Sequence, residues 1–289
     1  PRKKEFRDQV SLHRDKIRRL FGIFPTAFRN TELMYNNHIA EVVADMGYVA
    51  MLCEKRNDMF TQGNRPISPN AVFRAKDTNM IVLPRNRDLS DDIAFRFPHM
   101  PIRADQFAAY IAGIDGEAVI LGYDFEHIGE HIWKERGIFE FWNNLPEALM
   151  DASNIVMQNP SEIADTFKGS SDCPVIDIHA LSTSSWADAG RDTFGWLGNP
   201  TQYNLFRDIE KLEGDVKRAG GELLTKWRYL TTSDHVYFLH EHIGEDHAVH
   251  SYFNPYGGSI AQPTHVLTRK IDDLESAIRR YEILKRAER

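Results

Sequence analysis

The first 125 residues alternate short apolar runs with stretches whose apolar residues recur at helical spacing, and this alternation constrains the fold most strongly. Strands that alternate with helices favour βαβ units and therefore a parallel sheet, either open or closed into a barrel. Candidate strands are residues 22–28, 48–52, 71–73, 80–83 and 118–123, and candidate helices are 37–46, 90–97 and 104–113. The pattern predicts an α/β protein.

The pattern changes after about residue 150. One more apolar run covers 174–178, and the remainder is mostly helical. The last segment has apolar residues on one face, as in a helix packed against other helices. They are Ile271, Leu274, Ala277, Ile278, Tyr281 and Leu284. Helices are expected at 201–217, 222–231, 233–242 and 264–287. We therefore expect a first domain over residues 1–155 and a mainly helical region over residues 156–289.

The composition excludes several classes of protein. Hydrophobic residues make up 42% and charged residues 27% of the chain, as in soluble globular proteins. No stretch approaches the roughly 18 apolar residues that a membrane span needs. A formal net charge of −7 gives a nucleic acid a repulsive average field. We expect neither a membrane nor a nucleic acid as partner.

The two cysteines and the first residues of the chain indicate the cellular compartment. Cys53 and Cys173 are far apart and lack metal-ligand spacing, which favours two buried thiols in a reducing compartment over a disulfide. The basic start is followed by acidic residues and not by the apolar run of a signal peptide. A cytoplasmic location is the expectation.

Two acidic residues follow candidate strands, at the edge where α/β folds place their reactive groups. Glu32 follows the run that ends at Phe28, and Asp124 follows the run 118–123. Taken singly, such an Asp is often a helix N-cap, and a Glu in a first helical turn is common. As a pair they suit glycoside hydrolysis, in which one carboxylate attacks the anomeric carbon and a carboxylic acid protonates the leaving oxygen.

Polar neighbours of both carboxylates could bind sugar hydroxyls or hold a carboxylate ionised. Arg29 and Asn30 precede Glu32, and His127 and Glu130 lie about one turn beyond Asp124.

A competing interpretation comes from His127-Ile128-Gly129-Glu130-His131, the reversed zinc-protease pattern. On a helix, His127 and His131 would share one face as zinc ligands, with Glu130 as general base. A polysaccharide-deacetylase arrangement would add Asp124 to the two histidines around a metal. Gly129 weakens the helix that either arrangement needs, so both metal interpretations are less favoured.

Tryptophans are interleaved with charges between Ser185 and Asn199. Trp186, Asp192 and Trp196 suit sugar binding, in which aromatic faces stack on a pyranose and carboxylates bind its hydroxyls. Core tryptophans with paired surface charges explain the same composition equally well. A histidine-rich run is more typical of a solvated helix and turn than of a metal site; it comprises His235, His240, His242, His247 and His250. No Gly-x-Ser-x-Gly motif supports a serine nucleophile.

Five blocks, in chain order, resemble α-amylase-like members of glycoside hydrolase family 57: residues 28–33, 89–97, 123–131, 185–199 and 250–256. The resemblance implies a partial (β/α)7 barrel followed by a C-terminal helical bundle, which completes the substrate cleft. It implies a retaining mechanism on α-1,4-glucans without metal or organic cofactor. Glu32 falls on the nucleophile and Asp124 on the acid/base, and Trp186 and Trp196 fall in the family's last conserved segment.

The retaining mechanism predicts carboxyl groups of Glu32 and Asp124 about 5–5.5 Å apart. The same residues would serve a 4-α-glucanotransferase or a branching enzyme. A non-catalytic glucan-binding homologue and a zinc-dependent hydrolase using His127 and His131 stay open as alternatives.

The chain also departs from the family pattern. The family's His-Gln-Pro motif is absent before Glu32, which implies that the opening barrel strands lie outside this chain. An N-terminal segment or a second copy of the chain would then cover the open side, and the activity of this chain alone would depend on that cover.

Overall fold

The computed structural model describes residues 2–57, 59–61, 63, 65–187, 190–241, 254–257 and 259–288. The chain divides into two compact units, Pro1–Trp186 and Ala187–Arg289. The division lies later than the expected boundary at 155/156. The reason is that β5 (Val175–Ile176) pairs with β3 (Phe73–Ala75), so the chain beyond residue 155 is still part of the first unit.

A five-stranded sheet in the order β1-β2-β4-β3-β5 forms the centre of the first unit. β1 (Ala27–Arg29), β2 (Ala50–Glu54) and β4 (Ile81–Arg85) are parallel neighbours. The α/β class is confirmed, but the expectation of a purely parallel sheet is wrong because β3 runs antiparallel to β4. Only a short turn joins these two strands, whereas a parallel pair needs a crossover of a dozen or more residues.

Two candidate strands differ from their prediction. The run 22–28 pairs only over Ala27–Arg29, and Ile23 and Phe24 before it are exposed. Residues 118–123 form no strand. The Asn86 N–H donates to the Ile120 carbonyl (2.8 Å), which keeps this segment beside the end of β4 without a ladder.

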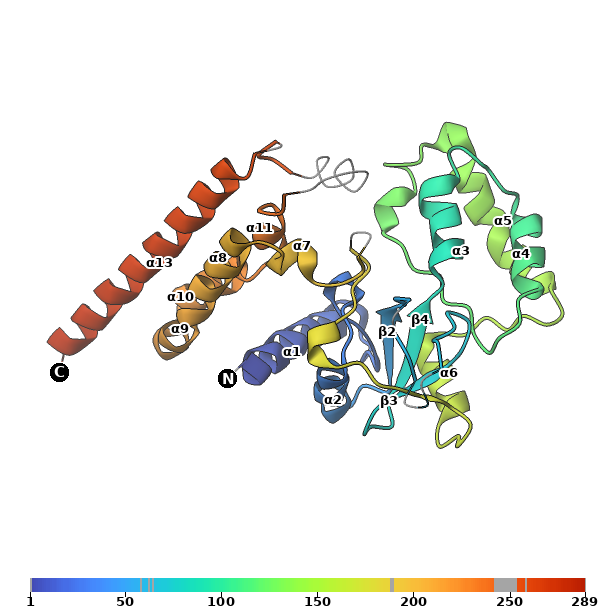
Figure 1. Cartoon of the computed structure of the whole chain (residues 1–289), viewed down its shortest axis with the longest axis horizontal. Coiled ribbons are helices and arrows are strands. Elements are labelled where there is room, and N and C mark those ends of the chain that lie inside the picture. The colour runs from blue at the N-terminus through green and yellow to red at the C-terminus, as the bar shows by residue number, and fades with distance from the viewer. Residues whose placement is uncertain are drawn as a thin grey trace. The chain divides into compact units, whose positions relative to one another are not determined.

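Helices cover both faces of the sheet (Figure 1). Successive strand residues point to opposite faces, so Val82 packs in one buried cluster and Ile81 and Leu83 in another. α1 (Arg2–Phe21) and α2 (Asn37–Asp45) contribute to the first cluster, and α6 (Pro160–Phe167) to the second. Burial on both faces explains why the strands are apolar runs without polar alternation.

A further helical cluster in the first unit follows β4. The Asn86 side chain accepts the Leu89 N–H (3.0 Å) and so caps α3 (Arg87–Asp91), which continues into a π-helical turn, Asp92–Arg96. α4 (Ala104–Ala112) and α5 (Ile138–Asp151) pack on this turn through a shared core. The helices expected at 90–97 and 104–113 are thus confirmed to within a few residues.

The second unit is helical, as expected for this part of the chain. The predicted helix 201–217 divides at Leu212 into two helices. The predicted stripe of the last helix is buried at Ile271, Leu274 and Ile278, but Leu284 at its end is exposed. No helix in the described ranges is long and apolar enough to cross a bilayer. The helices are α7 (Phe194–Leu197), α8 (Pro200–Lys211), α9 (Glu213–Ala219), α10 (Gly221–Leu230), α11 (Ser233–Tyr237) and α13 (Ala261–Ala287).

Both cysteines are free and buried in the first unit, as predicted. Cys53 lies in β2, and the Cys173 thiol faces the Val72 carbonyl at 3.4 Å. Burial raises the pKa of the Cys173 thiol to about 11 and that of Cys53 further still. Neither thiol is in a setting that favours a reactive thiolate.

Candidate active site

A tight turn at the carboxyl end of β1 carries Glu32. The Asn30 side chain accepts the Thr31 N–H (3.1 Å) and donates to the Met34 carbonyl (3.2 Å), so both ends of its amide hold a 3₁₀ turn over Thr31–Leu33. Glu32 and Leu33 have positive φ angles of 52° and 51°. Non-glycine residues adopt this region at a cost of about 1–3 kcal/mol each, so the turn persists because its surroundings hold it.

Trp186 holds Glu32 through both its main chain and its side chain. The Trp186 backbone N–H donates to the Glu32 carbonyl (2.9 Å), and the indole Nε1–H donates to carboxylate atom Oε2 (2.7 Å). The Arg29 guanidinium lies over the Trp186 ring, 4.5 Å from its centroid. Trp186 is thus brought together with Arg29 and Glu32, which lie more than 150 residues earlier in the chain.

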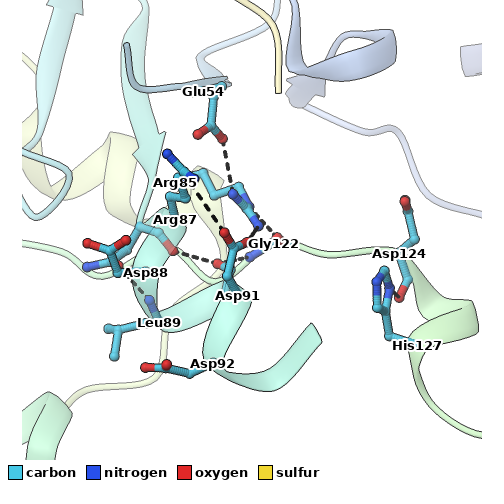
Figure 2. A network of polar contacts seen from close by, with 12 residues as sticks. Glu54, Arg85, Arg87, Asp88, Leu89, Asp91, Asp92, Gly122, Asp124 and His127 are labelled. Carbon is cyan, nitrogen blue, oxygen red and sulfur yellow. Dashed lines mark hydrogen bonds and ion pairs between the residues drawn. The ribbon is translucent and has the colours of Figure 1, made fainter. Parts of the chain in front are cut away.

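Asp124 precedes the 3₁₀ turn Phe125–His127 but does not cap it with its side chain. Its backbone carbonyl lies 3.0 Å from Nδ1 of His127 (Figure 2). A carbonyl can only accept, so Nδ1 of His127 carries the proton of this bond. The N-cap interpretation of Asp124 is therefore wrong, and its half-buried carboxyl is left for another task.

Burial, modified by charged neighbours, sets the pKa of Asp124. Burial raises the pKa of its carboxyl and Glu126 raises it further, whereas Arg29, His127 and Arg85 lower the same pKa, with a net rise. A raised pKa favours a protonated carboxyl, which is the form that a general acid needs. Arg29 acts on Asp124 and also contacts the ring that binds Glu32, so it connects the surroundings of the two carboxyl groups.

The helix required by the zinc interpretation is absent. After the short turn at Phe125–His127 the chain bends at Gly129, whose φ is 102°, and a Cβ there would approach the Phe139 ring to 3.0 Å. His127 and His131 have ring centroids 5.1 Å apart, and Glu130 and His131 are exposed. In the described part of the chain, no group of three or more His, Cys, Asp or Glu side chains could hold a metal ion.

The remaining predicted residues belong to the second unit. Asp192 accepts the Phe194 N–H (2.7 Å). Trp196 is buried and packs on Tyr237, with ring centroids 5.2 Å apart, so its core interpretation is confirmed. Asp188, His242, His247 and His250–Phe253, which belong to the motifs considered above, lie outside the described residues.

Three buried charges beside the site were missed in the sequence (Figure 2). Arg85 donates to Glu54 (3.3 Å) and to Asp91 (2.6 Å), and its Nε donates to the Gly122 carbonyl (2.5 Å). Its guanidinium also lies 5.7 Å from the Trp186 ring centroid. The sequence does contain a signal for two of them: Glu54 directly follows the apolar run 50–53, and Arg85 directly follows the apolar run 81–84.

Comparisons with known sequences cover most of the chain. The model of glycosyl hydrolase family 57 matches residues 1–175. A curated protein of Methanocaldococcus jannaschii, named "Putative alpha-amylase", is 34% identical over 270 residues. The match covers 87% of this chain and 55% of that protein, so the chain spans about half the length of this relative.

Comparisons with solved structures show a shared fold at low identity. A family 57 branching enzyme from Thermococcus kodakaraensis, solved with glucose, superposes with a TM-score of 0.67 at 13% identity. That match covers 94% of this chain and 62% of the enzyme. The α-amylase from Thermotoga maritima gives 0.59 at 12% identity, over 95% of this chain and 65% of its own.

Proposed function

Because the chain belongs to glycosyl hydrolase family 57, we propose that it carries the catalytic carboxyl groups of an enzyme that cleaves α-1,4-glucans. Glu32 is the nucleophile and Asp124 the acid/base of a retaining double displacement. The activity and the oligo- or polysaccharide substrate of the whole protein are part of this proposal, since the chain spans 55% of its curated relative.

The contrast between the two carboxyl groups carries the assignment. The Glu32 carboxylate accepts a hydrogen bond from a group that can only donate, the Trp186 indole N–H, which suits an ionised nucleophile. Asp124 is half-buried and its pKa is raised, chiefly by burial, which suits the protonated acid. Two carboxyl groups whose surroundings favour opposite charge states fit the two roles of a retaining glycosidase.

The reaction then proceeds in two balanced steps. A Glu32 carboxylate oxygen attacks the anomeric carbon while the Asp124 carboxyl gives its proton to the glycosidic oxygen, which leaves as a hydroxyl. Asp124, now ionised, takes a proton from water, whose oxygen displaces Glu32 and restores the α configuration. If a glucan hydroxyl replaces water, the same site performs transfer, as a branching enzyme or a 4-α-glucanotransferase does.

Neighbouring side chains support these steps without reacting. Arg29 is placed to offset the charge that Asp124 acquires when it gives up its proton. His127 and its hydrogen bond fix the backbone carbonyl of Asp124. Trp186 fixes the carboxylate of Glu32 by the bond from its indole.

Variants of the two carboxyl groups test the proposal. Glu32→Gln should lower turnover of both a glucan and an α-maltosyl fluoride by about 10⁴-fold, because no covalent intermediate forms. Asp124→Asn should lower glucan turnover by about 10²–10⁴-fold. With the fluoride, the first step, seen as a burst of released fluoride, should be affected far less because fluoride leaves without protonation, and the second step should be slow because the base is missing. Glu147→Gln, on an exposed carboxylate of α5, is the matched control.

Product analysis completes the test. NMR of the first product should show the α anomer, and chromatography separates hydrolysis from transfer. Normal turnover by Glu32→Gln, or a β product, would refute the assignment of the residues. Glucan binding without turnover in the wild-type protein would instead favour the non-catalytic alternative, and activity lost on chelation and restored by zinc would favour the metal alternative.

A further inference from the structure

We propose that Arg85 is a positioning residue of this site: a buried guanidinium, fixed by Glu54 and Asp91, that places the segment carrying Asp124 and lies beside the indole that binds Glu32. The inference rests on the proposed roles of Glu32 and Asp124. Arg85 does not touch the substrate in this account, because it acts through Gly122 and Trp186.

The two carboxylates that anchor Arg85 come from two other elements of the first unit, β2 and α3 (Figure 2). Glu54 and Arg85 end neighbouring parallel strands and are register partners, and Asp91 ends the helix that follows Arg85. All three residues are less than 10% exposed. Arg87 also binds Asp91 (3.3 Å) but its side chain is half exposed. Arg85 is therefore held on two sides by carboxylates that cannot move into solvent.

Stability alone gives a weak reason for such a cluster. The cost of removing charges from water offsets much of the attraction between them, and apolar side chains of similar volume often serve the fold as well. A planar guanidinium, however, directs several donors in fixed directions at once. That property matters where a particular group must be held at a particular place.

The group that Arg85 holds is the Gly122 carbonyl, two residues before Asp124. Residues 118–123 form no strand, so no backbone ladder fixes them. Arg85 Nε–H supplies the bond that a neighbouring strand would otherwise give, and the Ser90 hydroxyl accepts the Gly122 N–H (3.1 Å). Both polar groups of the Gly122 backbone are thus bound by side chains. These two bonds fix the position of the backbone two residues before Asp124.

The same guanidinium reaches the surroundings of Glu32. Its carbon lies 5.7 Å from the centroid of the Trp186 ring, and the Arg29 guanidinium lies 4.5 Å from it. Arginine beside an aromatic face is an attractive contact at these distances. Arg85 therefore contacts one group tied to each catalytic carboxyl.

Two variants separate the geometry of Arg85 from its charge. Arg85→Lys keeps the cation but loses the planar fork, so the bond to the Gly122 carbonyl is lost or displaced. The triple variant Glu54→Gln, Arg85→Met, Asp91→Asn removes the buried charges together, so that none is left unpaired. Arg87→Lys is the matched control, because Arg87 binds the same Asp91 carboxylate from the exposed side, whereas Arg85 binds Gly122. Urea unfolding confirms that each variant is folded before it is assayed.

Kinetics of the full-length protein give the first result. Arg85→Lys should lower kcat by about 10- to 100-fold, as expected for misplacement by a fraction of an ångström to an ångström, with KM changed much less. Arg87→Lys should keep the wild-type kcat. Equal effects of Arg85→Lys and Arg87→Lys on kcat would overturn the proposal.

The pH profile gives a result that a purely structural role would not produce. The groups that act on Asp124 are Glu126, Arg29, His127 and Arg85, and Arg85 lowers its pKa. The triple variant also neutralises Glu54 and Asp91, but neither carboxylate is among the groups that shift the pKa of Asp124, so the loss of the Arg85 cation should raise that pKa and move the alkaline limb of the kcat profile to higher pH. Arg85→Lys should leave the limb in place. A folded triple variant with the wild-type limb would overturn the proposal.

A titration of Asp124 by carboxyl ¹³C NMR keeps this inference distinct from the proposed function. Full activity of Glu32→Gln would refute the proposed function, whereas the NMR titration still measures the action of Arg85 on Asp124. A higher pKa in the triple variant than in wild type supports the inference, and an equal pKa contradicts it, whatever the turnover.

Discussion

Asp124 is expected to affect stability, whatever its chemical role, because burial raises the pKa of its carboxyl. Below its unfolded pKa, Asp124 is neutral in both states, and its favourable contribution is complete. As the pH rises through the higher folded pKa, the native state must hold a charge that its surroundings disfavour, and that contribution is lost. Asp124→Asn should therefore be more stable than wild type at pH 7.

Urea unfolding at several pH values measures this effect. The difference in midpoint between Asp124→Asn and wild type should be positive at pH 7 and shrink toward pH 3. A difference that does not change with pH would show that the two states bind protons equally at Asp124.

Trp186 offers a second test at the scale of a single residue. Trp186→Phe keeps an aromatic ring but removes the N–H that binds Glu32. A hydrogen bond to a charged group contributes about 1.5–3 kcal/mol, so kcat/KM should fall by roughly 10- to 150-fold. Trp133→Phe, at an exposed position, is the matched control and should change little. Equal activity of both variants would rule out a role for the indole bond.

Single residues also show what could be predicted from sequence. Glu32 and Asp124 stand out because each follows an apolar run, and Arg29 and Trp186 because their types suit a sugar site. Glu54 and Arg85 carry the same signal, a charge that closes an apolar run, but their pairing depends on strand register. Which strands are neighbours is decided by the whole sheet, and the local sequence does not contain it.

Helices and strands were predicted well where the spacing of apolar residues within the segment itself determines the structure. The last helix, α13, shows this most clearly, since its predicted stripe is buried from Ile271 to Ile278, although Leu284 beyond it is exposed. Residues 118–123 show the opposite case. They have the apolar composition of a strand, yet their polar groups bind side chains and turns from other segments. A strand needs a partner with a free edge, and composition does not reveal whether one is available.

α13 supplies a prediction about stability. Leu274 is 4% exposed within its buried face, so Leu274→Ala should leave a cavity and destabilise the second unit by about 2–5 kcal/mol. Ile283 on the same helix is 66% exposed, and Ile283→Ala should change the free energy of unfolding by at most about 0.5 kcal/mol. Thermal unfolding followed by circular dichroism compares the two variants. Similar losses would mean that this face contributes little to the core.

At the scale of the whole molecule, the order of an α/β part followed by a helical part was predictable, because the period of the apolar residues changes along the chain. The position of the division was not. The two-residue strand β5 pairs with β3, about one hundred residues earlier, and this pairing extends the first unit to Trp186. So short a strand has almost no sequence signature of its own. Its assignment as a strand depends on pairing with β3, which is distant in the sequence.

Both cysteines of the chain lie in the first unit, and both are shielded from solvent. The protein therefore contains a natural probe for the opening of one unit alone. A coloured thiol reagent added to the native protein reacts only when the sheet around Cys53 or the contact at Cys173 opens. The rate of colour development then reports the local dynamics of the first unit, without a label and without interference from the second unit.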